Sequence, residues 1–97
     1  MSTRVAVIGI VVEEQDSVGA LNELLHEYSP YIIGRMGIPY RTRGINVISI
    51  AVDAPEDTIS SLEERIGHIP GASAKTAYSS AVYAEFGVKH CWYVDPM

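Results

Sequence analysis

The strongest candidate for chemistry is a short basic stretch in which arginines alternate with glycines. Residues 34–44 read Gly-Arg-Met-Gly-Ile-Pro-Tyr-Arg-Thr-Arg-Gly, so three of the chain's seven basic residues fall within nine positions. Guanidinium groups bind carboxylates and phosphates through paired hydrogen bonds, and glycines let a ligand approach the backbone. One interpretation is therefore a pocket for a small anion at a seam between subunits. Its candidate residues are Arg35, Gly37, Tyr40, Arg41 and Arg43.

The same stretch has two other interpretations. The simpler one is an edge strand with solvated arginines and glycine bends. The other is a nucleic-acid interface, which the charge balance disfavours, because twelve acidic residues against seven basic ones give a net charge of −5. Phosphate binding needs a concentrated positive face. We therefore expect no direct DNA binding by this chain alone.

Two further polar residues join the candidate ligand-binding set. Asn22 and His26 are four positions apart on an expected helix, turned away from its leucine stripe. They form either an ordinary exposed face or a polar pair that faces a neighbouring subunit or a ligand.

Metal binding within one chain is not expected. The possible ligands are His26, His68, His90 and Cys91, and the adjacent pair 90–91 would point to opposite faces of a strand. The sequence has none of the paired spacings typical of metal sites. Histidines shared between two subunits are left open as an alternative, a metal-responsive sensor, and no cofactor is assigned.

We expect no enzymatic activity. The sequence contains no G-x-S-x-G, no phosphate-binding loop and no dinucleotide fingerprint. The alternative is a small dimeric enzyme with a ferredoxin-like fold, in which Tyr28, Tyr31 and Tyr40 would line a cavity between sheet and helices.

These residues must be positioned by six elements that hydrophobic periodicity predicts. Strands are expected at 5–12, 31–38, 45–52 and 72–79, and helices at 18–28 and 55–66. The order β-α-β-β-α-β is typical of the ferredoxin-like fold. The class is thus α+β, with both helices on one face of an antiparallel sheet, because right-handed crossovers place them there.

Several details of these elements are also predicted. Gln15-Asp16-Ser17 should cap the first helix, Pro55 should take the first position of the second, and Gly67 should end it. The strand 5–12 is apolar at both alternating sets of positions, which predicts a central strand covered on both faces.

For the second strand, Ile32, Met36 and Ile38 should share one face and Ile33 and Arg35 the other. A turn should span 39–44.

The chain is short and apolar enough to favour self-association. Its 97 residues are one domain, yet 47% of them are hydrophobic and the mean hydropathy is +0.12. The sheet face opposite the helices carries apolar residues, and pairing with another subunit would cover it. We expect a domain at 1–80 and an apolar extension at 81–97, which adds a strand or reaches a neighbouring subunit.

The setting expected for the chain is the cytoplasm. The single cysteine cannot form an intrachain disulfide. The longest apolar run, 5–12, is far shorter than the ~20 residues that span a bilayer. No signal sequence is recognised at the N-terminus, so no membrane association is expected.

Three segments resemble one known family. They are Asn22-Glu-Leu-Leu-His26-Glu-Tyr-Ser29, Ile33-Gly-Arg-Met-Gly-Ile-Pro39, and Asp57-Thr-Ile59 with the helix that follows. Over residues 4–80 the chain resembles the small regulators of the iron-only hydrogenase system. The resemblance implies an ACT-like version of the ferredoxin-like fold, related to the C-terminal regulatory domain of nickel-responsive repressors. It also implies a ligand-sensing or oligomerising module linked to transcription, assembled as dimers or tetramers.

The sequence departs from these relatives in two respects. The tail after Ser80 extends beyond what most members of the regulator family contain. The histidine-rich metal site and the DNA-binding ribbon of the nickel repressors are not reproduced. The resemblance therefore implies sensing and assembly, and it supplies neither a ligand nor a DNA-binding element.

Overall fold

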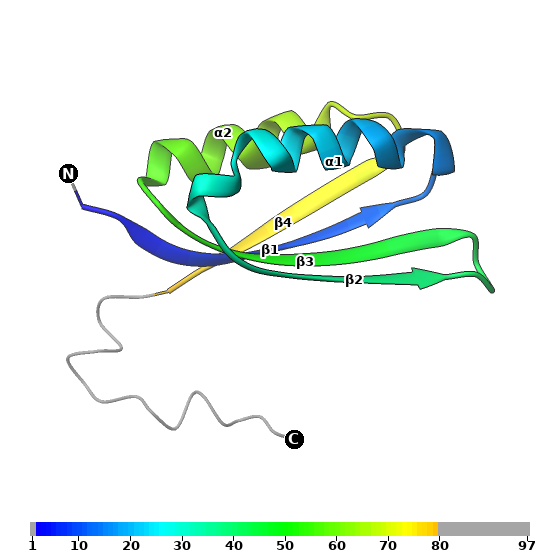
Figure 1. Ribbon diagram of the computed structural model, residues 1–97, viewed down its shortest axis with the longest axis horizontal. Helices are drawn as coiled ribbons and strands as arrows, with labels where there is room; N and C mark the ends of the chain where they lie inside the picture. Colours follow the sequence, from blue (N-terminus) through cyan, green and yellow to red (C-terminus); the bar gives the residue numbers. More distant parts are fainter. Residues whose placement is uncertain (1, 80–97) are drawn as a thin grey trace, which may run out of the picture.

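The computed structural model describes residues 2–79, which follow the predicted order β-α-β-β-α-β (Figure 1). Short 3-10 turns at Gln15–Ser17 and Ser29–Tyr31 precede and follow the first helix. The extension expected at 81–97 lies outside the described residues. The strands are β1 Arg4–Val12, β2 Ile32–Tyr40, β3 Ile45–Ala54 and β4 Ala72–Tyr78, and the helices are α1 Val18–Glu27 and α2 Glu56–Gly67.

The four strands form one antiparallel sheet in the order β2-β3-β1-β4. Both helices lie on the same face of that sheet, and they run in opposite directions across it (Figure 1). The predicted ferredoxin-like α+β fold is confirmed. It follows from two right-handed crossovers, each of which carries the chain over one face of the sheet.

The core lies between the helices and one face of the sheet. Alternate residues of β1 and β3 point into it, as the pleat of a strand requires. Leucine and isoleucine stripes of α1 and α2 cover them and fill the space between the two layers. The core residues are Ala6, Ile8, Ile10, Val12, Leu21, Leu24, Leu25, Ile48, Ile50, Val52, Ala54, Ile59, Leu62 and Ile66. Each large side chain buried here contributes about 1.5–3 kcal/mol to stability.

The other side of the sheet, which we call the open face, is largely apolar along β1, β2 and β3 and uncovered in the described part of the chain. It carries Val5, Val7, Met36, Ile38, Tyr40 and Val47, which are between 38% and 60% exposed. It also carries two charged residues, Asp53 beside Val5 and Lys75 beside Gly9. The sequence correctly predicts that β1 is an inner strand. The expectation that β1 is covered on both faces is wrong within residues 2–79, because both helices pack on one side.

A β-bulge changes the alternation expected for β2. The register shifts between Ile32 and Gly34, so that Ile32 pairs with Val52 while Gly34 pairs with Ala51. Ile32 therefore joins the core, whereas Met36 lies on the open face. The prediction that Ile32, Met36 and Ile38 share one face is wrong, because an extra residue in a strand inverts the parity beyond it.

The turn between β2 and β3 is shorter than expected. Pro39 and Tyr40 pair with Asn46 and Ile45, so they belong to β2. The turn is confined to residues 41–44 and closes on Gly44, whose φ is +68°. Proline is compatible with this position because β2 is an edge strand.

The ends of the two helices differ from the predicted ones because of local hydrogen bonding. No side chain caps α1, and the Ser17 hydroxyl instead donates to the carbonyl of Pro70 at 2.6 Å. Pro55 is the N-cap of α2 rather than its first residue. Gly67 is the last helical residue, and the glycine that adopts a left-handed backbone after α2 is Gly71, with φ of +75°.

Candidate functional site

The structure joins two of the residues that the sequence singles out. The Arg35 guanidinium donates a hydrogen bond to the side-chain oxygen of Asn22 at 2.5 Å, and thereby connects β2 to α1. Arg35 reaches the helix side because it pairs with Ile50, a buried residue of β3. His26 lies one turn further along α1 and is exposed.

Arg35 has unused capacity to bind an anion. The ion pairs between side chains of residues 2–79 are Arg4 with Glu56 and Arg65 with Glu27, so no described carboxylate neutralises Arg35. A guanidinium carries five N–H donors, and the hydrogen bond to Asn22 uses one. A carboxylate or phosphate could therefore bind here through paired hydrogen bonds.

The other candidate residues do not converge on Arg35. Gly37 is on the helix side of β2, where an added Cβ would lie 3.8 Å from the Ile48 side chain. Tyr40 lies on the open face, on the opposite side of the sheet. Arg41 and Arg43 are exposed in the turn that joins β2 to β3. The alternation of β2 thus divides a cluster that looks continuous in the sequence.

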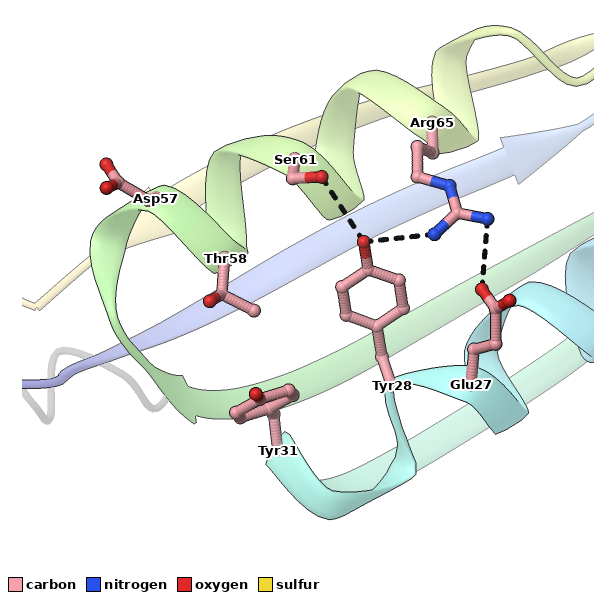
Figure 2. Close-up of a pocket in the computed structure, with 7 residues that line it drawn as sticks. All are labelled: Glu27, Tyr28, Tyr31, Asp57, Thr58, Ser61 and Arg65. Carbon is pink, nitrogen blue, oxygen red and sulfur yellow. Dashed lines mark hydrogen bonds and ion pairs between the residues drawn. The ribbon is translucent and has the colours of Figure 1, made fainter.

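A pocket lies elsewhere, between the C-terminal end of α1 and α2 (Figure 2). Its volume is about 460 Å³, and it opens to solvent. The antiparallel course of the helices creates it, because the end of α1 and the turn that follows lie beside α2. The lining residues are Glu27, Tyr28, Tyr31, Asp57, Thr58, Ser61 and Arg65.

One side of this pocket is a polar network centred on Tyr28 (Figure 2). Its hydroxyl is hydrogen-bonded to the Ser61 hydroxyl at 3.3 Å and accepts a bond from Arg65 at 3.2 Å. Arg65 also pairs with Glu27 at 2.9 Å, and its guanidinium carbon is 5.5 Å from the centre of the Tyr28 ring. The hydrogen bond with Ser61 and the neighbouring Arg65 guanidinium lower the pKa of the Tyr28 phenol below 10.0.

The other side of the pocket is formed by Tyr31, Asp57 and Thr58. The rings of Tyr28 and Tyr31 are 6.3 Å apart, centre to centre, and tilted by 50°. Asp57 is exposed in the first turn of α2, at the rim of the pocket. It takes part in neither of the described ion pairs.

Sequence reasoning missed most of this pocket. The alternative of a small enzyme places Tyr28, Tyr31 and Tyr40 together around a cavity between sheet and helices, but Tyr40 lies on the other side of the sheet. The charged lining residues had no local motif that could reveal them. The signal that could have indicated the pocket was the predicted topology, because antiparallel helices bring the end of one helix against the beginning of the other.

The described residues do not provide a metal centre. Between residues 2 and 79 there is no group of three or more histidine, cysteine, aspartate or glutamate side chains that could hold a metal ion. His26 is near the end of α1 and His68 directly follows α2, so the two lie at opposite ends of the helical layer. His90 and Cys91 lie outside the described residues.

Neither of the two helices in residues 2–79 combines the length and the apolar character needed to cross a membrane.

Comparisons with known proteins identify relatives of this chain in sequence and in structure. A family model described as "TM1266-like: Iron-only hydrogenase system regulator, putative" matches residues 4–76. The solved structure of the uncharacterized protein TM1266 from Thermotoga maritima is similar, with a TM-score of 0.78 and 31% sequence identity. That similarity covers 81% of this chain and 100% of the other. No curated protein matches the chain in sequence.

Proposed function

The chain belongs to the TM1266-like family of iron-only hydrogenase system regulators, and from that premise we propose that it is an oligomeric, ligand-sensing regulatory module. In this proposal its copies pair through the open face of the sheet. A small anionic effector binds near Asn22 and Arg35, and its binding alters the contact with a regulatory partner. The module is an ACT-like sensor in the cytoplasm, linked to transcription through that partner, and it is not an enzyme.

The observation that carries the proposal is the open face. Its apolar residues lie along β1, β2 and β3, and in the middle Gly9 pairs with Ser49 on one side and with Lys75 of β4 on the other. An apolar sheet face suits the packing of one sheet on another, at ~10 Å between sheets.

The size of the open face also supports pairing between copies. A sheet of four strands of about nine residues has a flat area of roughly 570 Å², before the area contributed by protruding side chains is added. Stable dimers bury about 800 Å² per partner. One sheet face is therefore of the order that a dimer needs, and a second copy supplies a surface of matching shape and polarity.

Two features argue against catalysis as the role. The space between sheet and helices is filled by aliphatic side chains such as Ile8, Leu21 and Ile59, each at most 1% exposed. The family description is that of a regulator. Direct DNA contact is not part of the proposal, because the net charge of −5 disfavours phosphate binding.

Sedimentation velocity on the full chain tests the pairing. Met36→Lys places a charge on the open face, in an edge strand that tolerates lysine, and should convert the oligomer to a monomer. Ser60→Lys, on the exposed side of α2, adds the same charge and should leave the assembly unchanged. A monomeric wild-type chain at micromolar concentration, or an equal effect of the two variants, would refute pairing through this face.

Effector binding is tested separately by calorimetry with inorganic phosphate and a series of di- and tricarboxylates. Arg35→Lys removes the forked donor and should weaken binding of the recognised anion about tenfold. Arg41→Lys, in the turn, is the matched control and should bind as the wild type does. Equal affinity of the two variants would remove Arg35 from the proposed site.

A further inference from the structure

Charged residues are rare in the sheet, and those on its helix side have partners. The four strands contain four charged residues, one in each. Arg4 of β1 lies 3.4 Å from the carboxylate of Glu56 on α2. Arg35 of β2 donates a hydrogen bond to Asn22 on α1. Both arginines therefore connect the sheet to the helices that cover it.

The other two charged residues, Asp53 and Lys75, lie on the open face. Asp53 stands between two buried residues of β3. Lys75 of β4 precedes Thr76, whose hydroxyl donates to Glu63 on α2 at 2.6 Å. Alternation along a strand therefore directs both charged side chains away from the helices (Figure 1). Both are exposed, and neither takes part in the ion pairs found within residues 2–79.

Asp53 and Lys75 are too far apart to form an ion pair within one chain. Asp53 pairs with Val5 of β1 and Lys75 with Gly9, so they are two strands and four residues apart. At ~4.8 Å between strands and ~3.3 Å per residue, this separation is about 16 Å. An ion pair requires approach within about 4 Å. Val7, midway between Val5 and Gly9, lies at the centre of the line that joins the two charges.

Contact between two open faces would remove water from both charges. A charge that loses water without gaining a partner destabilises the contact. In a pair of copies related by a two-fold axis, each contact occurs twice with the roles exchanged. An axis that passes between the sheets over Val7, at right angles to the line from Asp53 to Lys75, brings Asp53 of each copy opposite Lys75 of the other.

The lengths of the side chains suit this arrangement. Packed sheets lie ~10 Å apart, and the flexible four-carbon stem of a lysine spans much of that gap. The lysine ammonium group then approaches the aspartate carboxylate on the facing sheet. The two reciprocal contacts leave no net charge at the centre of the interface, although each chain has a net charge of −5.

We propose that Asp53 of one copy pairs with Lys75 of a second copy, and the reverse, and that these two ion pairs set the orientation in which open faces associate. The inference rests on the pairing proposed above and adds the residues that select the partner and the register. The apolar residues around Val7 supply the contact area. The charges exclude other orientations, because a displaced copy would leave them unpaired or place like charges together.

The experiment measures the dimer dissociation constant of the full chain by sedimentation velocity over a dilution series. Asp53→Lys and Lys75→Asp each place like charges opposite one another and should weaken the dimer at least about tenfold. Glu64→Lys, on the exposed side of α2, changes the net charge as Asp53→Lys does and should leave the dissociation constant unchanged.

Mixing the two variants tests the pairing directly. In a mixed pair of Asp53→Lys with Lys75→Asp, both contacts again join a lysine to an aspartate. The mixture should therefore form mixed dimers as readily as the wild type forms its own, and native mass spectrometry distinguishes them by mass. A mixture of Glu64→Lys with Lys75→Asp should give few mixed dimers, because one of its two contacts joins two aspartates. Recovery in the first mixture also shows that both variants are folded.

The outcomes separate this inference from the function on which it rests. A wild-type chain that stays monomeric at micromolar concentration would overturn both. A wild-type dimer whose dissociation constant is unaffected by Asp53→Lys and Lys75→Asp would overturn the ion pairs alone and leave pairing through the open face intact. Failure of the two variants to associate when mixed, or equal weakening by Glu64→Lys, would likewise overturn the ion pairs.

Discussion

At the scale of single residues, the polar network around Tyr28 is the clearest link between the two helices. It joins the end of α1 to α2 through Ser61, Arg65 and Glu27, all close to the surface. Surface ion pairs contribute little stability individually. The expected role of this network is to fix the orientation of the tyrosine ring.

The first prediction concerns the ionisation of Tyr28. Ser61→Ala and Arg65→Gln should each raise the pKa of the phenol, because the hydrogen bond and the cation favour the phenolate. In the wild type, the native state loses this proton before the unfolded state does. Tyr28 should therefore increase the free energy of unfolding as pH rises from its lowered pKa towards 10.0.

This pKa can be followed through the ¹³Cζ resonance of Tyr28 in the full chain. An identical Tyr28 titration in the wild type and both variants would contradict the assigned hydrogen bonds.

The second prediction compares two glycines. Gly71 has φ of +75°, and an added Cβ would lie 2.7 Å from the Glu14 Cγ. Gly71→Ala should therefore lower the free energy of unfolding by at least about 1–2 kcal/mol. Gly67→Ala, in α2 with no atom within 4 Å of the new Cβ, should raise it by about 0.5–1 kcal/mol. Urea denaturation measures both, and an equal effect would disprove the backbone argument.

At the scale of elements, neighbouring residues of β1 differ in how deeply their side chains are buried. Ile8 is fully buried against the helices, whereas Val7 is 46% exposed on the open face. The two side chains belong to the same strand and differ by the side to which the pleat directs them.

The third prediction uses this contrast. Ile8→Ala should lower the free energy of unfolding by about 2–5 kcal/mol, because it leaves a cavity in the core. Val7→Ala should lower the free energy of unfolding by about 1 kcal/mol or less when the protein is dilute enough to be monomeric. Denaturation curves at low concentration give both values. A large loss for Val7→Ala under these conditions would mean that the open face is covered within a single chain.

At the scale of the whole molecule, stability and assembly are coupled if copies pair through the open face. A small domain buries a modest fraction of its surface, so an interface contributes substantially to its stability. Binding of a partner to the native state makes the unfolding midpoint depend on protein concentration.

The fourth prediction follows from this coupling. A tenfold increase in protein concentration should add about 1.4 kcal/mol to the apparent free energy of unfolding per dimer. The Met36→Lys variant should lose this dependence, and the Ser60→Lys variant should keep it. A urea midpoint of the wild type that is independent of concentration would be evidence for a stable monomer.

The sequence by itself determined the order of the elements and the layers they form. Hydrophobic residues at spacings of two in β1 and β3, and of three or four in α1 and α2, identify the faces that meet in the core. These patterns are local, because the period of a strand or helix fixes which side chains share a face. The right-handed crossover then placed both helices on one side.

The tertiary structure alone decided which polar residues meet. The bulge between Ile32 and Gly34 reset the parity of β2, and pairing with β3 then directed Arg35 toward Asn22 and Tyr40 toward the open face. The pocket arose because antiparallel helices bring Tyr28 against Arg65, 37 positions away. Such contacts depend on register and packing between distant segments, which no local period of the sequence encodes.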